Sequence, residues 1–196
     1  MEFKTVTKTK ICGINSVESL EAAIDGGAAA VGFVFFLASP RSVNIEAASK
    51  LVAKVPKNIL RVGLTVNMKD RDLIEIVDNV ALDMLQLHGD ESPKRTFEIK
   101  EVSELPIIKA IKLASPGDIA KAAPYIGLVE QILFDSMPPK DMKQALPGGN
   151  AVSFDWKWLG DQNLPYPWML SGGLNAKNIE TAIKTTGASF VDVSSG

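Results

Sequence analysis

The chain contains very little of several residue types that particular classes of protein require. It has one cysteine and one histidine among 196 residues, which excludes a disulfide within the chain and a zinc site of the usual Cys/His kind. No apolar run approaches the ~20 residues that a membrane-spanning helix needs. The formal net charge is −2, and without a basic excess neither nucleic acid nor a membrane is an expected partner. The N-terminus lacks the pattern of a signal peptide, so a cytoplasmic location is expected.

Short apolar runs, rich in β-branched residues, recur along the chain and predict eight strands. Runs of this length that are apolar on both faces suit parallel strands covered by helices. The expected strands are 9–12, 30–35, 60–66, 84–87, 106–111, 131–134, 167–170 and 190–193.

Helical segments are expected between these strands. Ser16 is a capping residue at the start of the first helix, and Ser92 followed by Pro93 opens another. The segments expected to be helical are 16–25, 45–55, 69–80, 92–102, 116–123, 154–159 and 175–185, with a loop at 137–149.

This alternation of strands and helices predicts an α/β fold, a (β/α)8 TIM barrel that forms a single domain over residues 1–196. Eight strands favour the closed barrel over an open doubly wound sheet, and no G-x-G-x-x-G motif follows the first strand. The sequence stops directly after the eighth predicted strand, so the eighth helix of such a barrel is expected to be missing from this chain.

Two residues with acid–base chemistry stand at the ends of predicted strands in opposite halves of the chain. Cys12 ends the first strand and Asp135 follows the sixth, and catalytic residues of (β/α)8 barrels lie at the C-terminal ends of strands. The pair offers a base and an acid on facing sides of a barrel mouth. The alternatives are a small buried side chain for Cys12 and a turn cap for Asp135.

Several motifs, in order along almost the whole chain, resemble those of the phosphoribosylanthranilate isomerase family of tryptophan synthesis. They are Lys10-Ile11-Cys12-Gly13, Gly32-Phe33-Val34-Phe35 with Ser39-Pro40-Arg41, Leu85-Gln86-Leu87-His88-Gly89-Asp90-Glu91, Leu133-Phe134-Asp135-Ser136, Phe154-Asp155-Trp156, Leu170-Ser171-Gly172-Gly173-Leu174 and Val191-Asp192-Val193-Ser194-Ser195-Gly196. The resemblance implies an Amadori rearrangement of a phosphosugar substrate without metal or cofactor. It also implies that Cys12 is the general base, Asp135 the general acid, and Arg41 the residue that holds the anthranilate carboxylate.

The chain departs from the family pattern at one loop. Gly148-Gly149-Asn150-Ala151 stands where the family usually has Gly-Gly-Thr/Ser-Gly, so the loop after the sixth strand is expected to bend differently. The roles of Cys12 and Asp135 are also chemically demanding, because a free thiol titrates near ~8.5 and a carboxyl near ~3.9. A nearby cation would favour the thiolate.

Strand alternation supplies further candidates. Lys10 shares a face with Cys12, and Asp192 faces away from its apolar neighbours. Since the first and last strands of a barrel are neighbours, we expect a Lys10–Asp192 pair inside the barrel, beneath Cys12. The same alternation turns Gln86 and His88 toward the barrel, with His88 in a supporting role.

A phosphate site is expected at the loops after the seventh and eighth strands, where such barrels often bind phosphate on backbone N–H groups. Gly172 and Gly173 precede a predicted helix, and Ser195 and Gly196 supply the second loop. The alternative for the glycine pair is a tight turn without a ligand.

Other functions remain open at this point. One alternative is a pentose-phosphate epimerase barrel, a family whose metal site is built from several His and Asp residues. The presence of a single histidine in this chain counts against it. The Amadori isomerase of histidine synthesis uses paired aspartates and gives Cys12 no role. A third alternative is a phosphate-binding barrel without turnover. A monomer and a homodimer are both compatible with the sequence.

Overall fold

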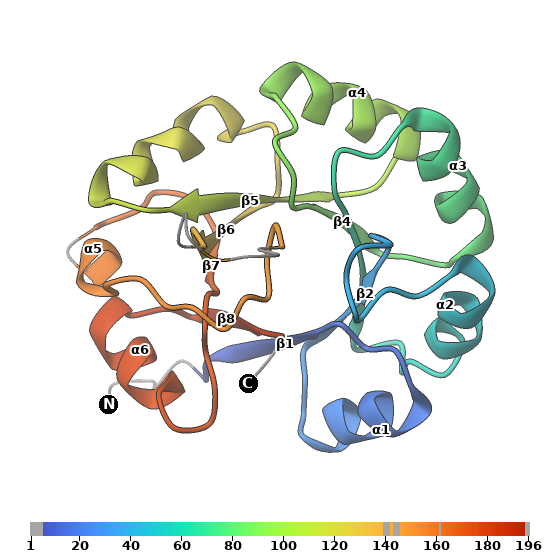
Figure 1. The fold of residues 1–196 in the computed structure, drawn as a ribbon, viewed down its shortest axis with the longest axis horizontal. Coiled ribbons are helices and arrows are strands. Elements are labelled where there is room, and N and C mark those ends of the chain that lie inside the picture. Colours follow the sequence, from blue (N-terminus) through green and yellow to red (C-terminus); the bar gives the residue numbers. More distant parts are fainter. Residues whose placement is uncertain (1–5, 139–141, 143–145, 161, 195–196) are drawn as a thin grey trace.

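The computed structural model describes residues 6–138, 142, 146–160 and 162–194. Its strands form one closed parallel barrel in the order of the sequence, enclosed by a ring of helices (Figure 1). Each expected strand is present, with ends that differ by at most a few residues. The strands are β1 (Lys8–Cys12), β2 (Ala30–Val34), β3 (Leu60–Thr65), β4 (Met84–Leu87), β5 (Ile107–Leu113), β6 (Gln131–Ser136), β7 (Trp168–Leu170) and β8 (Phe190–Val193).

The helices follow the predicted segments, and local capping explains where several begin. The Ser16 side chain accepts a hydrogen bond from the Ser19 N–H at the start of α1, and the Ser92 hydroxyl caps α4 through the Arg95 N–H. The helices are α1 (Val17–Asp25), α2 (Ile45–Val52), α3 (Asp70–Asn79), α4 (Pro93–Ser103), η1 (Pro116–Tyr125), α5 (Lys157–Gly160) and α6 (Ile179–Thr186).

α2 ends at Val52 instead of residue 55, and α5 begins at Lys157 instead of residue 154. Two other helices differ from the prediction for reasons that the structure shows. η1 is a 3-10 helix rather than an α-helix and contains Pro124, which has no N–H to donate within a helix. α6 begins at Ile179 instead of residue 175, because the Asn175 side chain accepts a hydrogen bond from the Lys177 N–H. Such a local side-chain bond stabilises a turn in competition with the helix.

The barrel interior is apolar below and polar at the C-terminal ends of the strands. Its apolar layer consists of Ala30, Val62, Ile108, Ala110, Leu133 and Met169. Leu85 and Leu87 pack outside the barrel against helices, whereas Gln86, between them, lies on the inner face. The strand register places Lys10 beside Asp192 and Lys112 beside Asp135.

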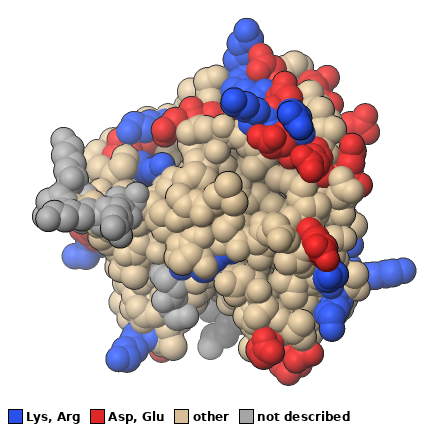
Figure 2. Space-filling model, turned by 45° about the vertical axis from the view of Figure 1, so that its right-hand side comes forward, with Lys and Arg blue, Asp and Glu red and all other residues tan. Residues whose placement is uncertain are grey.

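On the face shown in Figure 2, positive and negative side chains are intermingled around a largely uncharged centre. Ion pairs on the surface, such as Lys50–Glu46 and Lys184–Glu180, are of the exposed kind that contribute little to stability. Among the described residues, no helix is long and apolar enough to cross a membrane.

Candidate active site

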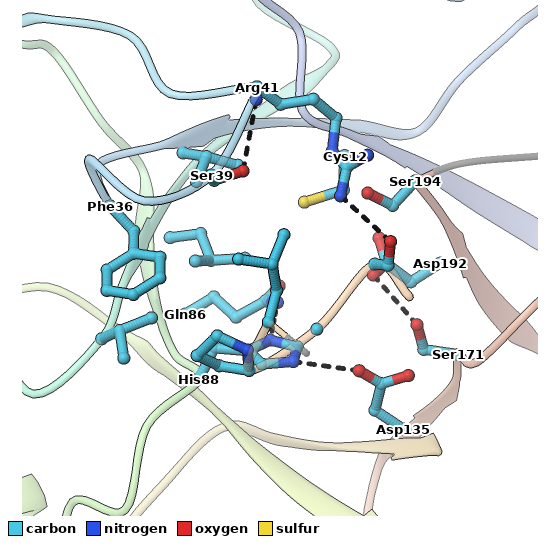
Figure 3. Close-up of a pocket in the computed structure, with 17 residues that line it drawn as sticks. Cys12, Phe36, Ser39, Arg41, Gln86, His88, Asp135, Ser171, Asp192 and Ser194 are labelled. Carbon is cyan, nitrogen blue, oxygen red and sulfur yellow. Dashed lines mark hydrogen bonds and ion pairs between the residues drawn. The ribbon is translucent and has the colours of Figure 1, made fainter. Parts of the chain in front are cut away.

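A pocket opens at the C-terminal ends of the strands and gathers most of the residues singled out from the sequence (Figure 3). Its polar lining includes Cys12 from β1, Arg41 from the loop after β2, His88 after β4, Asp135 from β6 and Asp192 from β8. Residues separated by more than a hundred positions therefore share one cavity, because closing the barrel brings all strand ends to one mouth.

The β1/β8 side of the pocket is built on a buried ion pair. Lys10 Nζ lies 2.8 Å from Asp192 Oδ1, and Lys10 is fully buried. The Ser171 hydroxyl donates to the other carboxylate oxygen of Asp192 at 3.3 Å. The pairing expected from strand alternation is confirmed.

Gly32 on β2 provides the space for this arrangement. A Cβ atom at position 32 would lie 2.8 Å from Cys12 Sγ and 3.2 Å from Lys10 Nζ. The sulfur and the ammonium group thus both lie against the same glycine, and a larger residue there would displace one of them. Cys12 itself is only 4% exposed.

Burial raises the pKa of the Cys12 thiol, and this effect exceeds the lowering by the nearby Lys10 ammonium. Asp192 adds to the rise, since it neutralises the lysine and is itself negative. Lys10 therefore favours the thiolate, as the sequence led us to expect, but the pKa of the Cys12 thiol is raised overall. Burial alone would lower the pKa of Lys10, yet Asp192 and Cys12 together raise it.

The opposite side of the pocket holds a chain of three buried polar side chains from β4 and β6. Gln86 Nε2 lies 2.8 Å from His88 Nδ1, and His88 Nε2 lies 3.0 Å from Asp135 Oδ2. Asp135 Oδ1 accepts a hydrogen bond from the Ser136 N–H. Sequence reasoning gave His88 only a supporting role and assigned none to Gln86. The alternation of the Gln-Leu-His motif was the available signal.

Arg41 reaches over the mouth near Cys12. Its Nη2 donates to the Gly149 carbonyl at 3.4 Å, and its Nε is buried without a partner among the described residues. Gly13 makes room for the side chain, because a Cβ there would lie 2.4 Å from Arg41 Cδ. The guanidinium therefore retains an unused donor at the pocket.

The loop after β6 covers part of the pocket. The Asn150 amide bonds to both backbone groups of Leu146, accepting at 2.9 Å and donating at 2.7 Å. Gly148 packs so closely that a Cβ atom would lie 2.4 Å from His88 Nε2. Ala151 has φ +56°, in the left-handed region that favours glycine. The departure from the family pattern thus places a strained alanine in this loop.

The glycine turn after β7 borders a second, smaller hollow. Gly172 and Gly173 have φ of +93° and +63°, and a Cβ on Gly172 would lie 2.8 Å from the Ser136 nitrogen. Within the described residues, no hydrogen bond uses the N–H of either glycine. Ser195 and Gly196, the other predicted phosphate residues, lie outside the described residues. Sequence reasoning assigned no role to four polar residues that also line the hollow, which are Ser136, Asn150, Ser171 and Ser194.

The fold and the pocket together define a (β/α)8-barrel enzyme equipped for proton transfer, with a thiol facing a carboxyl–imidazole pair. Across the described residues, no cluster of three or more His, Cys, Asp or Glu side chains is arranged to hold a metal ion.

Comparisons with known proteins identify the family. The model of the family described as N-(5'phosphoribosyl)anthranilate (PRA) isomerase matches residues 9–196. The N-(5'-phosphoribosyl)anthranilate isomerase of Parvibaculum lavamentivorans is 47% identical over 96% of this chain and 88% of its own length. The enzyme of Brucella canis is 46% identical over 95% and 83%. This chain belongs to the N-(5'-phosphoribosyl)anthranilate isomerase family.

Solved structures agree with this assignment. The phosphoribosyl anthranilate isomerase of Thermotoga maritima superposes with a TM-score of 0.85 and 32% identity over 97% of this chain and 89% of its own. A phosphoribosyl anthranilate isomerase in complex with reduced 1-(o-carboxyphenylamino)-1-deoxyribulose 5-phosphate has a TM-score of 0.80 and 32% identity, over 97% and 88%.

Proposed function

We propose that this protein converts N-(5-phosphoribosyl)anthranilate to 1-(2-carboxyphenylamino)-1-deoxyribulose 5-phosphate, the third step of tryptophan synthesis from chorismate. The observation that carries the proposal is the convergence of the Cys12 thiol and the Asp135 carboxyl on one pocket, from opposite sides of the barrel. The family membership supports it, and so does the related isomerase that holds a reduced form of this product.

Asp135 is the general acid in this proposal. It gives a proton to the ring oxygen of the ribose, the bond between that oxygen and C1 breaks, and the nitrogen lone pair forms a C=N bond to C1. The product of this step is an open-chain iminium with a new hydroxyl group. A positioned acid contributes about 10²- to 10⁴-fold to such a step.

Cys12 is the general base. Its thiolate removes the proton from C2, and the electron pair left behind forms the C1=C2 bond and neutralises the iminium nitrogen. The resulting enolamine becomes the ketone when C1 gains a proton and the C2 hydroxyl loses one, which returns the acid and the base to their starting forms. Only protons move, so the reaction needs no redox partner.

The two anionic ends of the substrate have separate proposed partners. Arg41 binds the anthranilate carboxylate, since its buried Nε still has a proton to donate and a guanidinium matches a carboxylate with two parallel hydrogen bonds. The backbone N–H groups of Gly172 and Gly173 bind the phosphate, together with Ser195 and Gly196. The backbone can approach a phosphate closely where no Cβ intervenes.

We propose a cytoplasmic location, because Cys12 is a free thiol and must stay reduced to act as a base. A monomer and a homodimer both remain candidates. The related isomerase of Thermotoga maritima occurs as monomers generated from a dimeric form.

A coupled assay tests the function. A transferase added to the solution would generate phosphoribosylanthranilate, and its fluorescence would be followed after addition of this protein. We expect rapid consumption that a metal chelator does not change and that Cys12→Ala abolishes. Substrate binding by folded protein without consumption would replace the proposal with a phosphate-binding barrel.

A further inference from the structure

We infer that Gln86 is a positioning residue that sets where the protons sit on His88 and thereby keeps Asp135 supplied with the proton it donates. The inference rests on the proposed role of Asp135 as the acid. It starts from the chain Gln86–His88–Asp135, in which Gln86 is fully buried and the other two are nearly so. Figure 3 shows the three side chains in line at one side of the pocket.

His88 connects Gln86 to Asp135, because the protonation of one ring nitrogen determines whether the other acts as a donor or an acceptor. When the extra proton lies on the 3.0 Å line between Nε2 and Asp135 Oδ2, the pair is either a neutral imidazole with a carboxylic acid or an imidazolium with a carboxylate. In both arrangements Nδ1 carries a hydrogen and needs an acceptor. When the pair has given that proton away, one hydrogen remains on Nδ1. If that hydrogen is exchanged onto Nε2, it donates to Asp135 there, and Nδ1 becomes an acceptor.

Gln86 can serve both states of Nδ1. Its amide nitrogen lies 2.8 Å from Nδ1, which suits the pair that has lost its proton. Its oxygen Oε1 is buried without a partner among the described residues. A half-turn of the carboxamide, whose two ends have nearly the same shape, brings that oxygen to Nδ1 and gives it the missing hydrogen bond. The carboxamide can therefore offer Nδ1 either a donor or an acceptor, and in the second orientation the loaded pair gains the hydrogen bond that Nδ1 needs.

Charged side chains also lie near the pair. On β5, Lys112 stands beside Asp135 in the register and shares its face, and Arg41 lines the same pocket. Across the mouth, Lys10 and Asp192 neutralise each other. An acceptor at Nδ1 stabilises a hydrogen on that nitrogen without adding a further charge to the pocket.

The lone histidine makes the inference directly measurable. Since His88 is the only histidine, ¹⁵N-histidine labelling gives the signals of this one ring, and they report which nitrogens are protonated, without any substrate. Gln86→Glu supplies an acceptor of the same length, and we expect it to keep the hydrogen on Nδ1. Gln86→Met has nearly the same shape but no acceptor, and we expect the hydrogen to move to Nε2.

Turnover gives the second readout. We expect Gln86→Met to lower kcat about tenfold or more with little change in KM, as is typical when a side chain that orients a catalytic group is removed. We expect Gln86→Glu to keep most of the kcat of the unaltered protein. Gln131→Met at the other end of β6 is the matched control and is expected to change neither kcat nor the ring signals.

Unchanged protonation of His88 in Gln86→Met would overturn the inference, as would equal loss of kcat in both Gln86 variants. If Gln86→Met does not fold, Gln86→Glu decides alone, and a hydrogen on Nε2 in that variant overturns the inference. Failure of the proposed function looks different, because unaltered protein would then be inactive in the coupled assay whatever the ring signals show.

Discussion

The two sides of the barrel mouth differ in how they hold charge and protons. On the β1/β8 side the charges are fixed, because Lys10 and Asp192 form a buried ion pair beneath Cys12. On the β4/β6 side Asp135 and His88 share a hydrogen bond along which a proton can move. A base must be free to take a proton and an acid must hold one in reserve. The barrel thus places a buried ion pair next to the base and a shared, exchangeable proton next to the acid.

The largest expected effect comes from removing the reacting groups themselves. Cys12→Ala and Asp135→Asn should each lower kcat about 10²- to 10⁴-fold, because each removes one positioned proton transfer. The double variant should lose less than the product of the two losses, since the groups act in one sequence. Single-turnover rates with both variants measure this. A Cys12→Ala enzyme within tenfold of the parent would show that the base lies elsewhere.

The next effect tests whether the β1/β8 charges are truly fixed. Lys10→Met leaves Asp192 buried and unpaired, and we expect a loss of about 3–5 kcal/mol in the free energy of unfolding. Lys10→Met combined with Asp192→Leu should recover most of that loss, because no buried charge remains. Urea denaturation compares the three proteins.

The same lysine variant should alter the pH–rate profile. Lys10 is the largest influence that lowers the pKa of the Cys12 thiol, so Lys10→Met should move the base limb of kcat/KM to higher pH. An unmoved limb would separate Lys10 from the base and leave it a purely structural role.

Arg41 lies at the rim and is expected to affect binding more than turnover. Arg41→Ala should raise KM about 10- to 100-fold, which corresponds to the ~1.5–3 kcal/mol of hydrogen bonds to a charged group, with kcat changed little. Arg41→Lys keeps the charge but lacks the paired donors, so its KM should lie between those of the unaltered protein and Arg41→Ala. Steady-state kinetics decide this, and an equal fall in kcat would instead assign Arg41 to the reaction step.

The position of each strand, and the inward direction of Lys10, His88 and Asp192, could be predicted from the sequence, because alternation and strand order determine which side chains share the barrel. The close packing could not be predicted. The 2.8 Å approach of position 32 to Cys12 Sγ and the fit of Gly148 against His88 arise between distant segments. The net rise in the pKa of Cys12 was missed for the same reason, since it depends on how far the barrel excludes water.

A smaller effect is expected on the free energy of unfolding at alkaline pH, and it comes from Cys12 on the β1/β8 side. The pKa of Cys12 is raised in the folded chain, so its contribution to stability is complete below the ordinary thiol value of about 8.5 and is lost as the pH rises through the folded pKa. We expect the free energy of unfolding to fall by roughly 1 kcal/mol per pH unit in that range. Cys12→Ala should remove this thiol-dependent fall.

The smallest effect concerns the loop that covers the mouth. Ala151→Gly removes a left-handed strain of roughly 1–2 kcal/mol but costs about 0.5–1 kcal/mol in chain entropy, so a small rise in Tm is expected. Ala53→Gly is a matched control, because Ala53 has an ordinary φ of −61° and should only lose stability. Equal Tm changes in both variants would show that position 151 is not strained.

The burial of the only thiol has a practical consequence. Because Cys12 is the single cysteine and lines the pocket, a thiol-selective reagent has one possible target, and its rate of attachment measures how accessible the pocket is. A molecule that occupies the pocket should protect the sulfur in proportion to its occupancy. The barrel thus carries its own reporter group, and affinities for substrate mimics can be read from a labelling rate without any catalytic turnover.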